Sequence, residues 1–93
     1  MYGLEIKEEA DKIFYKLSKK NLIRLKIIGK KIREIRENPN HAYKFLRKPL
    51  HTFNRVHIDK HFVLIFKINR QDKAIIIYYF DHHDKVYKWR PKT

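Results

Sequence analysis

Two runs of apolar residues, FVLIFKI at 62–68 and KAIIIYYF at 73–80, constrain the fold of this chain more than any other feature. Both are rich in β-branched and aromatic residues, which is typical of strands. The residues NRQD separate them at the length of a hairpin connection. An alternating segment, FNRVHI at 53–58, comes before the first run, and DKH at 59–61 separates the two. The pattern predicts three consecutive antiparallel strands.

Helical periodicity is confined to the first half of the chain. Residues 7–20 carry one apolar stripe, with acidic residues in the first turn and lysines in the last, as the helix dipole favours. Asn21 can cap a second helix that runs from Leu22 to about Glu37. The segment YGLEI at 2–6 predicts a short first strand. The expected fold is α+β: an N-terminal strand and a two-helix hairpin packed on one face of a mainly antiparallel β-sheet.

Length and composition limit the class of protein. Ninety-three residues fit one domain, expected to span residues 1–93. The chain contains no cysteine, which excludes disulfides and thiolate metal sites and agrees with a reducing compartment. No apolar run approaches the roughly 20 residues that span a bilayer, and no leader segment opens the chain. We therefore expect a soluble, cytoplasmic protein with no membrane partner.

The excess of positive charge points to a polyanionic partner. Twenty-three Lys and Arg against ten Asp and Glu give a net charge of +13. Residues 7–48 carry fourteen basic and five acidic side chains, and residues 49–93 carry nine and four, so the charge is not confined to a tail. A domain of this kind attracts polyanions at long range. Nucleic acid or the ribosome is the favoured target, and an acidic lipid surface or an acidic protein are the alternatives.

Histidines near the strand ends raise the question of metal binding. His57 and His61 lie four residues apart, and His82 and His83 are adjacent. Neighbouring histidines in a strand point to opposite faces, and His61 falls beyond the turn that follows His57. No other element specifies a cage of four ligands. We therefore expect no metal and no cofactor.

Proton transfer is the chemistry that these histidines suit better, because the ordinary pKa of histidine is about 6.5. His57 on one strand and His82 or His83 at the end of the last strand are expected to face one groove, with Arg55 on the same face as His57. Cleavage of RNA needs such proton transfers and positive charge at the phosphate. The structural alternative is that each histidine is an ordinary surface residue. Further RNA contacts are expected from Lys48, Lys60, Tyr87 and Trp89, although Trp89 could instead cover the edge of the core.

Two motifs resemble those of the RelE/ParE toxin superfamily of prokaryotic toxin–antitoxin modules. The stretch FLRKPLHTFNRVHI at 45–58 is similar to the family's entry to its sheet, and HHDKVY at 82–87 is similar to its closing signature. The resemblance implies a sheet like that of microbial ribonucleases. For the RelE branch it implies a metal-independent mRNA interferase that cuts mRNA in the ribosomal A site through attack of the 2′-hydroxyl. It also implies a cognate RelB-like antitoxin.

The resemblance also assigns positions. Arg55 and His57 match basic strand positions that contact and activate the RNA backbone, and Tyr87 matches the closing aromatic residue that positions the nucleotide. The terminal basic positions correspond to His82 and His83. The expected RNA-binding residues are completed by His61, which lies near a position used by a histidine-dependent subgroup, and by Arg47.

Two departures from the family pattern bear on catalysis. Val63 and Asp81 stand where many or some members carry arginine. Either the histidines replace these cations or catalysis is weak. The main hypothesis is a toxin that cleaves ribosome-bound mRNA, with an antitoxin, mRNA and ribosome as partners. The alternatives are a ParE-like toxin that inhibits DNA gyrase without nuclease activity, and a basic nucleic-acid-binding module without catalysis.

Overall fold

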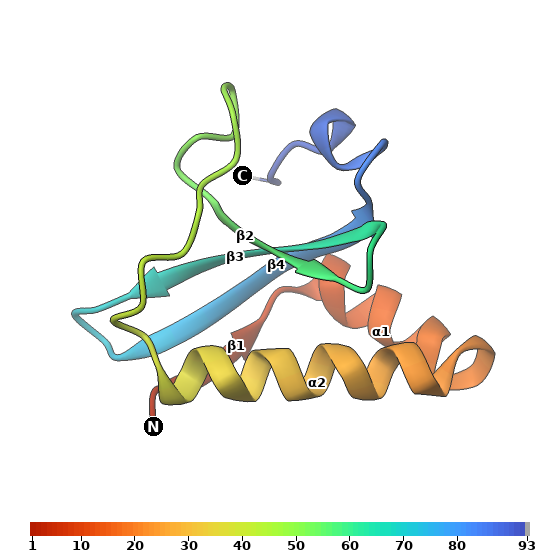
Figure 1. Ribbon diagram of the computed structural model, residues 1–93, viewed down its shortest axis with the longest axis horizontal. Coiled ribbons are helices and arrows are strands. Elements are labelled where there is room, and N and C mark those ends of the chain that lie inside the picture. Colours follow the sequence, from red (N-terminus) through yellow and green to blue (C-terminus); the bar gives the residue numbers. More distant parts are fainter. Residues whose placement is uncertain (93) are drawn as a thin grey trace.

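The computed structural model describes residues 1–92, so Thr93, the last residue of the expected domain, lies outside the described part. Two helices and a four-stranded sheet make up the fold (Figure 1). In chain order the elements are β1 (Gly3–Ile6), α1 (Glu8–Lys20), α2 (Leu22–Glu37), β2 (Asn54–Ile58), β3 (Phe62–Asn69), β4 (Ala74–His82) and the 3-10 helix η1 (Val86–Lys88).

The sheet has the strand order β1-β4-β3-β2. The predicted meander is confirmed, because β2 pairs antiparallel with β3 and β3 pairs antiparallel with β4. The first strand lies parallel to β4 at one edge, which leaves β2 at the other. The predicted α+β fold, with a mainly antiparallel sheet, is therefore confirmed.

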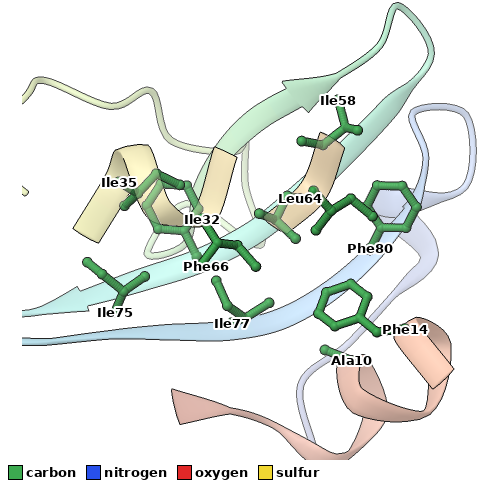
Figure 2. Close-up of a cluster of buried hydrophobic side chains, with 11 residues drawn as sticks. Ala10, Phe14, Ile32, Ile35, Ile58, Leu64, Phe66, Ile75, Ile77 and Phe80 are labelled. Carbon is green, nitrogen blue, oxygen red and sulfur yellow. The ribbon is translucent and has the colours of Figure 1, made fainter. Parts of the chain in front are cut away.

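The helical hairpin covers one face of the sheet (Figure 1). The predicted cap between the two helices is confirmed, because the Asn21 side chain accepts a hydrogen bond from the backbone N–H of Arg24 at 3.1 Å. The apolar stripes of both helices pack against β3 and β4 and make the larger core (Figure 2). Its buried members are Ala10, Phe14, Ile28, Ile32, Ile35, Ile58, Leu64, Phe66, Ile75, Ile77 and Phe80.

The other face of the sheet carries a second, smaller core. Side chains of β3 that point away from the helices meet the segment around η1 and the connector between α2 and β2, which spans residues 38–53. The connector runs beside β2, because the N–H of Arg55 donates to the Lys44 carbonyl at 2.9 Å and that of Leu46 donates to the Phe53 carbonyl at 3.0 Å. The buried members are Leu46, Leu50, Phe53, Val63, Ile65, Val86 and Trp89. None of the helices within residues 1–92 has the length and apolar character needed to cross a membrane.

Candidate RNA-binding face

Arg55 and His57 lie on the sheet face opposite the helices. Side chains alternate along a strand. Val56 and Ile58 pack on the helical core, so Arg55 and His57 point to the other side. His57 is exposed and Arg55 is half-buried. The expectation that these two residues share a face is therefore confirmed, and the strand that carries them is an edge strand.

Tyr87 and Arg47 form a contact on the same side of the sheet. The hydroxyl oxygen of Tyr87 accepts hydrogen bonds from the backbone N–H of Arg47 at 3.0 Å and from its Nε–H at 3.5 Å. The Arg47 guanidinium lies over the Tyr87 ring, 4.7 Å from its centroid. Burial acts to raise the pKa of Tyr87, but the hydrogen bonds from Arg47 and the charges of Arg47 and Arg55 outweigh it and lower the pKa below its ordinary value of 10. Arg47 is therefore the arginine that contacts this phenol, while Arg55 acts on it only through its charge.

A groove of about 400 Å³ runs beside β2. It opens next to Arg55 and His57, and the connector before β2 forms much of its wall. The basic side chains of this wall could not be predicted from the sequence, because the connector has no periodic pattern that would place them next to a strand. The lining residues are Lys31, His41, Ala42, Tyr43, Lys44, Arg55, Val56 and His57.

The structure contradicts the expectation that His57 faces His82, while the alternative that it faces His83 stays a prediction. His82 pairs with Phe62 across the strands and contacts its ring, with centroids 5.4 Å apart, so it points to the helix-covered side. His83 lies in the turn after β4, where its backbone N–H donates to the His61 carbonyl at 2.8 Å. The three rings of His61, His82 and His83 stack at centroid distances of 4.5–6.0 Å. They form one cluster at the end of the sheet, where the β2–β3 turn lies beside the end of β4 (Figure 1).

The Trp89 ring is buried and is not available for stacking with an RNA base. Its side chain packs edge-on against Phe53 and face-on against Tyr79, and its exposed fraction is 7%. Its Nε1–H donates to Glu9 Oε1 at 2.9 Å, which fixes the C-terminal segment to α1. The alternative that Trp89 covers the core edge is confirmed.

Lys48 and Lys60 do not gather around Arg55. Both are exposed, but Lys48 belongs to the loop before β2 and Lys60 to the turn after it. The two lysines therefore lie beyond opposite ends of the strand that carries Arg55, and the groove lysines are better placed beside it.

Comparison with known proteins gives the family. No protein-family model matches the chain. The chain is 53% identical over 88 residues to a Methanocaldococcus jannaschii protein that carries the toxin name RelE4, and the match covers 95% of this chain and 93% of that protein. The chain belongs to the RelE toxin family.

Solved structures of RelE-like folds agree with the architecture. The RelBE2 toxin–antitoxin complex from Mycobacterium tuberculosis contains a chain with a TM-score of 0.72 and 18% identity, covering 88% of this chain and 98% of that one. A metal-bound toxin from Helicobacter pylori has a TM-score of 0.74 and 21% identity, covering 92% of this chain and 99% of that one. At these identities the likeness shows the fold alone.

Structural residues occupy the two positions that depart from the family pattern, Val63 and Asp81. Val63 is 3% exposed and belongs to the second core. Asp81 pairs with Val63 across the strands, and its Oδ2 accepts a hydrogen bond from the Tyr79 hydroxyl at 2.7 Å. Burial, followed by the hydrogen bond and charge of Asp81, raises the pKa of Tyr79 to about 12. From the sequence, Asp81 was interpreted only as the loss of an arginine. Simple alternation from the buried Ile75 and Ile77 would place it on the helix side, and the register shift between β3 and β4 reverses this.

Proposed function

We propose that this RelE-family protein is a toxin that cleaves ribosome-bound mRNA as a metal-independent endoribonuclease. The observation that carries the proposal is the contact of Arg47 with Tyr87, on the same sheet face as Arg55 and His57. Two guanidinium groups, a phenol with a lowered pKa and an imidazole supply the positive charge and the proton-transfer groups that RNA cleavage needs.

Arg55 and Arg47 bind the scissile phosphate of the RNA. The scissile phosphate lies beside Arg55 and Arg47, whose charges stabilise the additional negative charge of the transition state. The lysines of the groove beside β2 guide the RNA backbone along the edge strand. The exposed cations of α2 add long-range attraction to ribosomal RNA, which weakens with salt.

Two groups move protons. His57 takes the proton from the 2′-hydroxyl, whose oxygen attacks the adjacent phosphorus. The bond from phosphorus to the 5′-oxygen breaks, which leaves a 2′,3′-cyclic phosphate and a 5′-hydroxyl. The Tyr87 hydroxyl donates the proton to the departing 5′-oxygen, because its lowered pKa makes it a stronger acid than an ordinary tyrosine. In this mechanism His82 and His83 take no part in proton transfer.

Primer extension on an mRNA in a reconstituted translation reaction tests the proposal. The protein is treated with EDTA and desalted before addition, so that the ribosomes keep their magnesium. We expect new stops at A-site codons that depend on ribosomes and disappear with Arg55→Ala. Arg70→Ala is the matched control, because Arg70 contacts the Pro39 carbonyl and the Asn40 side chain instead of Tyr87. Growth arrest with intact mRNA would contradict the nuclease and favour a toxin that acts by binding, such as a gyrase inhibitor.

A RelB-like antitoxin is the proposed protein partner. The M. tuberculosis neighbour is a toxin–antitoxin complex. In this chain an apolar groove of about 610 Å³ lies between the helical hairpin and β1, with Leu4, Leu25 and Ile28 in its wall and Arg33 and Arg36 at its side. An amphipathic, acidic antitoxin segment suits both its apolar floor and its charge.

Co-purification with the product of the adjacent gene tests this partnership. We expect Leu4→Asp to weaken the complex, because Leu4 lines the groove and is 40% exposed. Tyr15→Asp is the matched control, since Tyr15 is exposed on α1 and does not line the groove. Equal retention by both variants would place the antitoxin elsewhere.

A further inference from the structure

We propose that His61, His82 and His83 bind a divalent transition-metal cation of the kind that prefers imidazole, namely Zn²⁺, Ni²⁺ or Cu²⁺. One ring nitrogen from each histidine can be chosen so that all three lie within 4.8 Å of one another. Within residues 1–92 no other group of three or more His, Asp or Glu side chains comes this close together. Imidazole nitrogen is a ligand that these metals share.

The backbone already holds the three residues together. His82 pairs with Phe62, the neighbour of His61, in the β3–β4 ladder. The N–H of His83 donates to the His61 carbonyl at 2.8 Å, and the N–H of Lys85 donates to the His82 carbonyl at 2.9 Å. Because these backbone contacts hold the Cα atoms of the three histidines, binding of a cation needs to order only their side chains. The ligand set is therefore largely preorganised by the sheet.

Side-chain rotations complete the geometry. Zinc–nitrogen bonds of about 2.0–2.1 Å in a tetrahedral site place neighbouring nitrogens about 3.3 Å apart, closer than the present limit of 4.8 Å. His61 is exposed, and the side chains of His82 and His83 are 34% and 45% exposed. All three rings can rotate towards a shared point, and a cation can reach that point from solvent.

Hydrogen bonds select the metal-binding nitrogen of His83. Its Nδ1 lies 3.0 Å from the His61 carbonyl oxygen. A carbonyl only accepts hydrogen bonds, so Nδ1 carries a proton and Nε2 is the nitrogen that can bind the metal; a proton that Nε2 shares with Asp84 Oδ1, 3.0 Å away, is released on binding. Histidine ligands usually have such a partner on the second ring nitrogen.

Asp84 is the acidic partner of the cluster. Its Oδ1 lies 3.0 Å from His83 Nε2, and its Oδ2 lies 3.5 Å from His82 Nδ1. The carboxylate offsets part of the positive charge that a dication would bring to a protein of net charge +13. Mg²⁺ and Ca²⁺ prefer oxygen ligands, so three imidazoles and one carboxylate select against them.

The metal would join two segments at the end of the sheet. His61 belongs to the β2–β3 turn, and His83 begins the segment that leads to η1 and Tyr87. His82 points to the helix-covered side, whereas Arg55 and His57 point to the other. The cation would therefore stabilise the fold without touching the proposed RNA-binding groups, and the proposal does not depend on nuclease activity.

Titration of zinc sulfate into the full chain by calorimetry tests the site, with protein prepared without a histidine tag. We expect one Zn²⁺ per chain and a Kd that rises by about tenfold or more in each of His61→Ala, His82→Ala and His83→Ala. His51→Ala is the matched control, because His51 is an exposed histidine in the loop before β2, and its Kd is expected to stay within about twofold of wild type. Absence of stoichiometric binding to wild type, or an equal loss in His51→Ala, would overturn the proposal.

Two further measurements keep the proposal testable if an alanine variant fails to fold. Imidazole nitrogen NMR of the wild-type chain is expected to show zinc-dependent shifts for His61, His82 and His83 and none for His51. A ligand that binds only the native state raises Tm. We expect zinc to raise the Tm of wild type and of His51→Ala alike. Shifts spread over all histidines, or an unchanged Tm at saturating zinc, would also overturn it.

Discussion

Replacing Tyr79 by Phe tests how Asp81 is held on the sheet face opposite the helices. The Tyr79 hydroxyl donates to Asp81 Oδ2 at 2.7 Å, and the Tyr79 ring stacks on Trp89 with centroids 5.3 Å apart. Phenylalanine keeps the ring and removes only the donor. The free energy of unfolding of wild type minus that of the variant therefore reports this one hydrogen bond.

The pKa of Tyr79 gives the size and the sign of the expected effect. Burial, and then the contact with Asp81, raises this pKa from 10 to about 12 in the folded protein. A group whose folded pKa is raised stabilises the protein fully below its unfolded pKa and loses this contribution as pH rises through the folded pKa. A change of this size corresponds to at most about 2.7 kcal/mol. Because the side chain is only half-buried and water screens the contact, we expect about 1–2 kcal/mol.

Urea unfolding followed by circular dichroism at pH 8 to 11.5, at constant ionic strength, measures this difference. We expect wild type to exceed Tyr79→Phe by about 1–2 kcal/mol at pH 8–9, and the difference to shrink above pH 10. Lysine titration affects both proteins equally and cancels. Tyr15→Phe is the matched control, because Tyr15 is 63% exposed, and it should change the free energy of unfolding little at pH 8–9. A difference for Tyr79→Phe that stays constant to pH 11.5 would refute the coupling to Asp81.

Three other substitutions test separate parts of the molecule. Gly29→Ala should stabilise α2 by about 1 kcal/mol and raise Tm by about 4–8 °C in a thermal melt, because a Cβ there would meet no atom within 4 Å. Trp89→Ala should lower the free energy of unfolding by about 3–5 kcal/mol in urea; a neutral result would mean that Trp89 is not a core residue. Tyr87→Phe should slow mRNA cleavage by about 100-fold or more if its hydroxyl donates a proton, whereas full activity would leave Tyr87 only a stacking role.

The fold was largely predictable because local patterns and long-range packing agree. The second helix spans Leu22–Glu37 as expected from its Asn21 cap and apolar stripe. The short segments DKH and NRQD between the apolar runs correctly predicted the three antiparallel strands. Parallel pairing of β1 with β4 was not predicted, because an isolated segment of four residues does not specify its partner. The left-handed backbone conformation of Lys73, with φ of 52°, could not be predicted either, since lysine has no preference for that conformation.

The site was predicted less well because it depends on where strands end. The residues DHHDK after Phe80 indicate a strand end, but β4 finishes at His82 and the chain turns at once. That one-residue boundary decides whether His83 alternates to the opposite face or folds back beside His82. Arg55 and His57 were assigned correctly because both lie inside a regular strand. Lys31, His41 and Lys44 were missed because α2 and an irregular connector bring them to β2.

Val63 and Asp81, the two departures from the family's arginines, bear on where the proposed RNA-binding arginines can lie. Val63 fills the second core at 3% exposure, so an arginine there would displace packed apolar side chains. Its cross-strand neighbour Asp81 is already bound to Tyr79. The centre of this face is therefore committed to packing and to the hydrogen bonds of Asp81, which accepts from the Tyr79 hydroxyl and from the His82 backbone N–H. Arg47 and Arg55 instead come from the connector and the edge strand, where Tyr87 positions one and the groove lies beside the other. An RNA backbone would then meet this protein along β2, while the histidine cluster at the end of the sheet remains free for a different ligand.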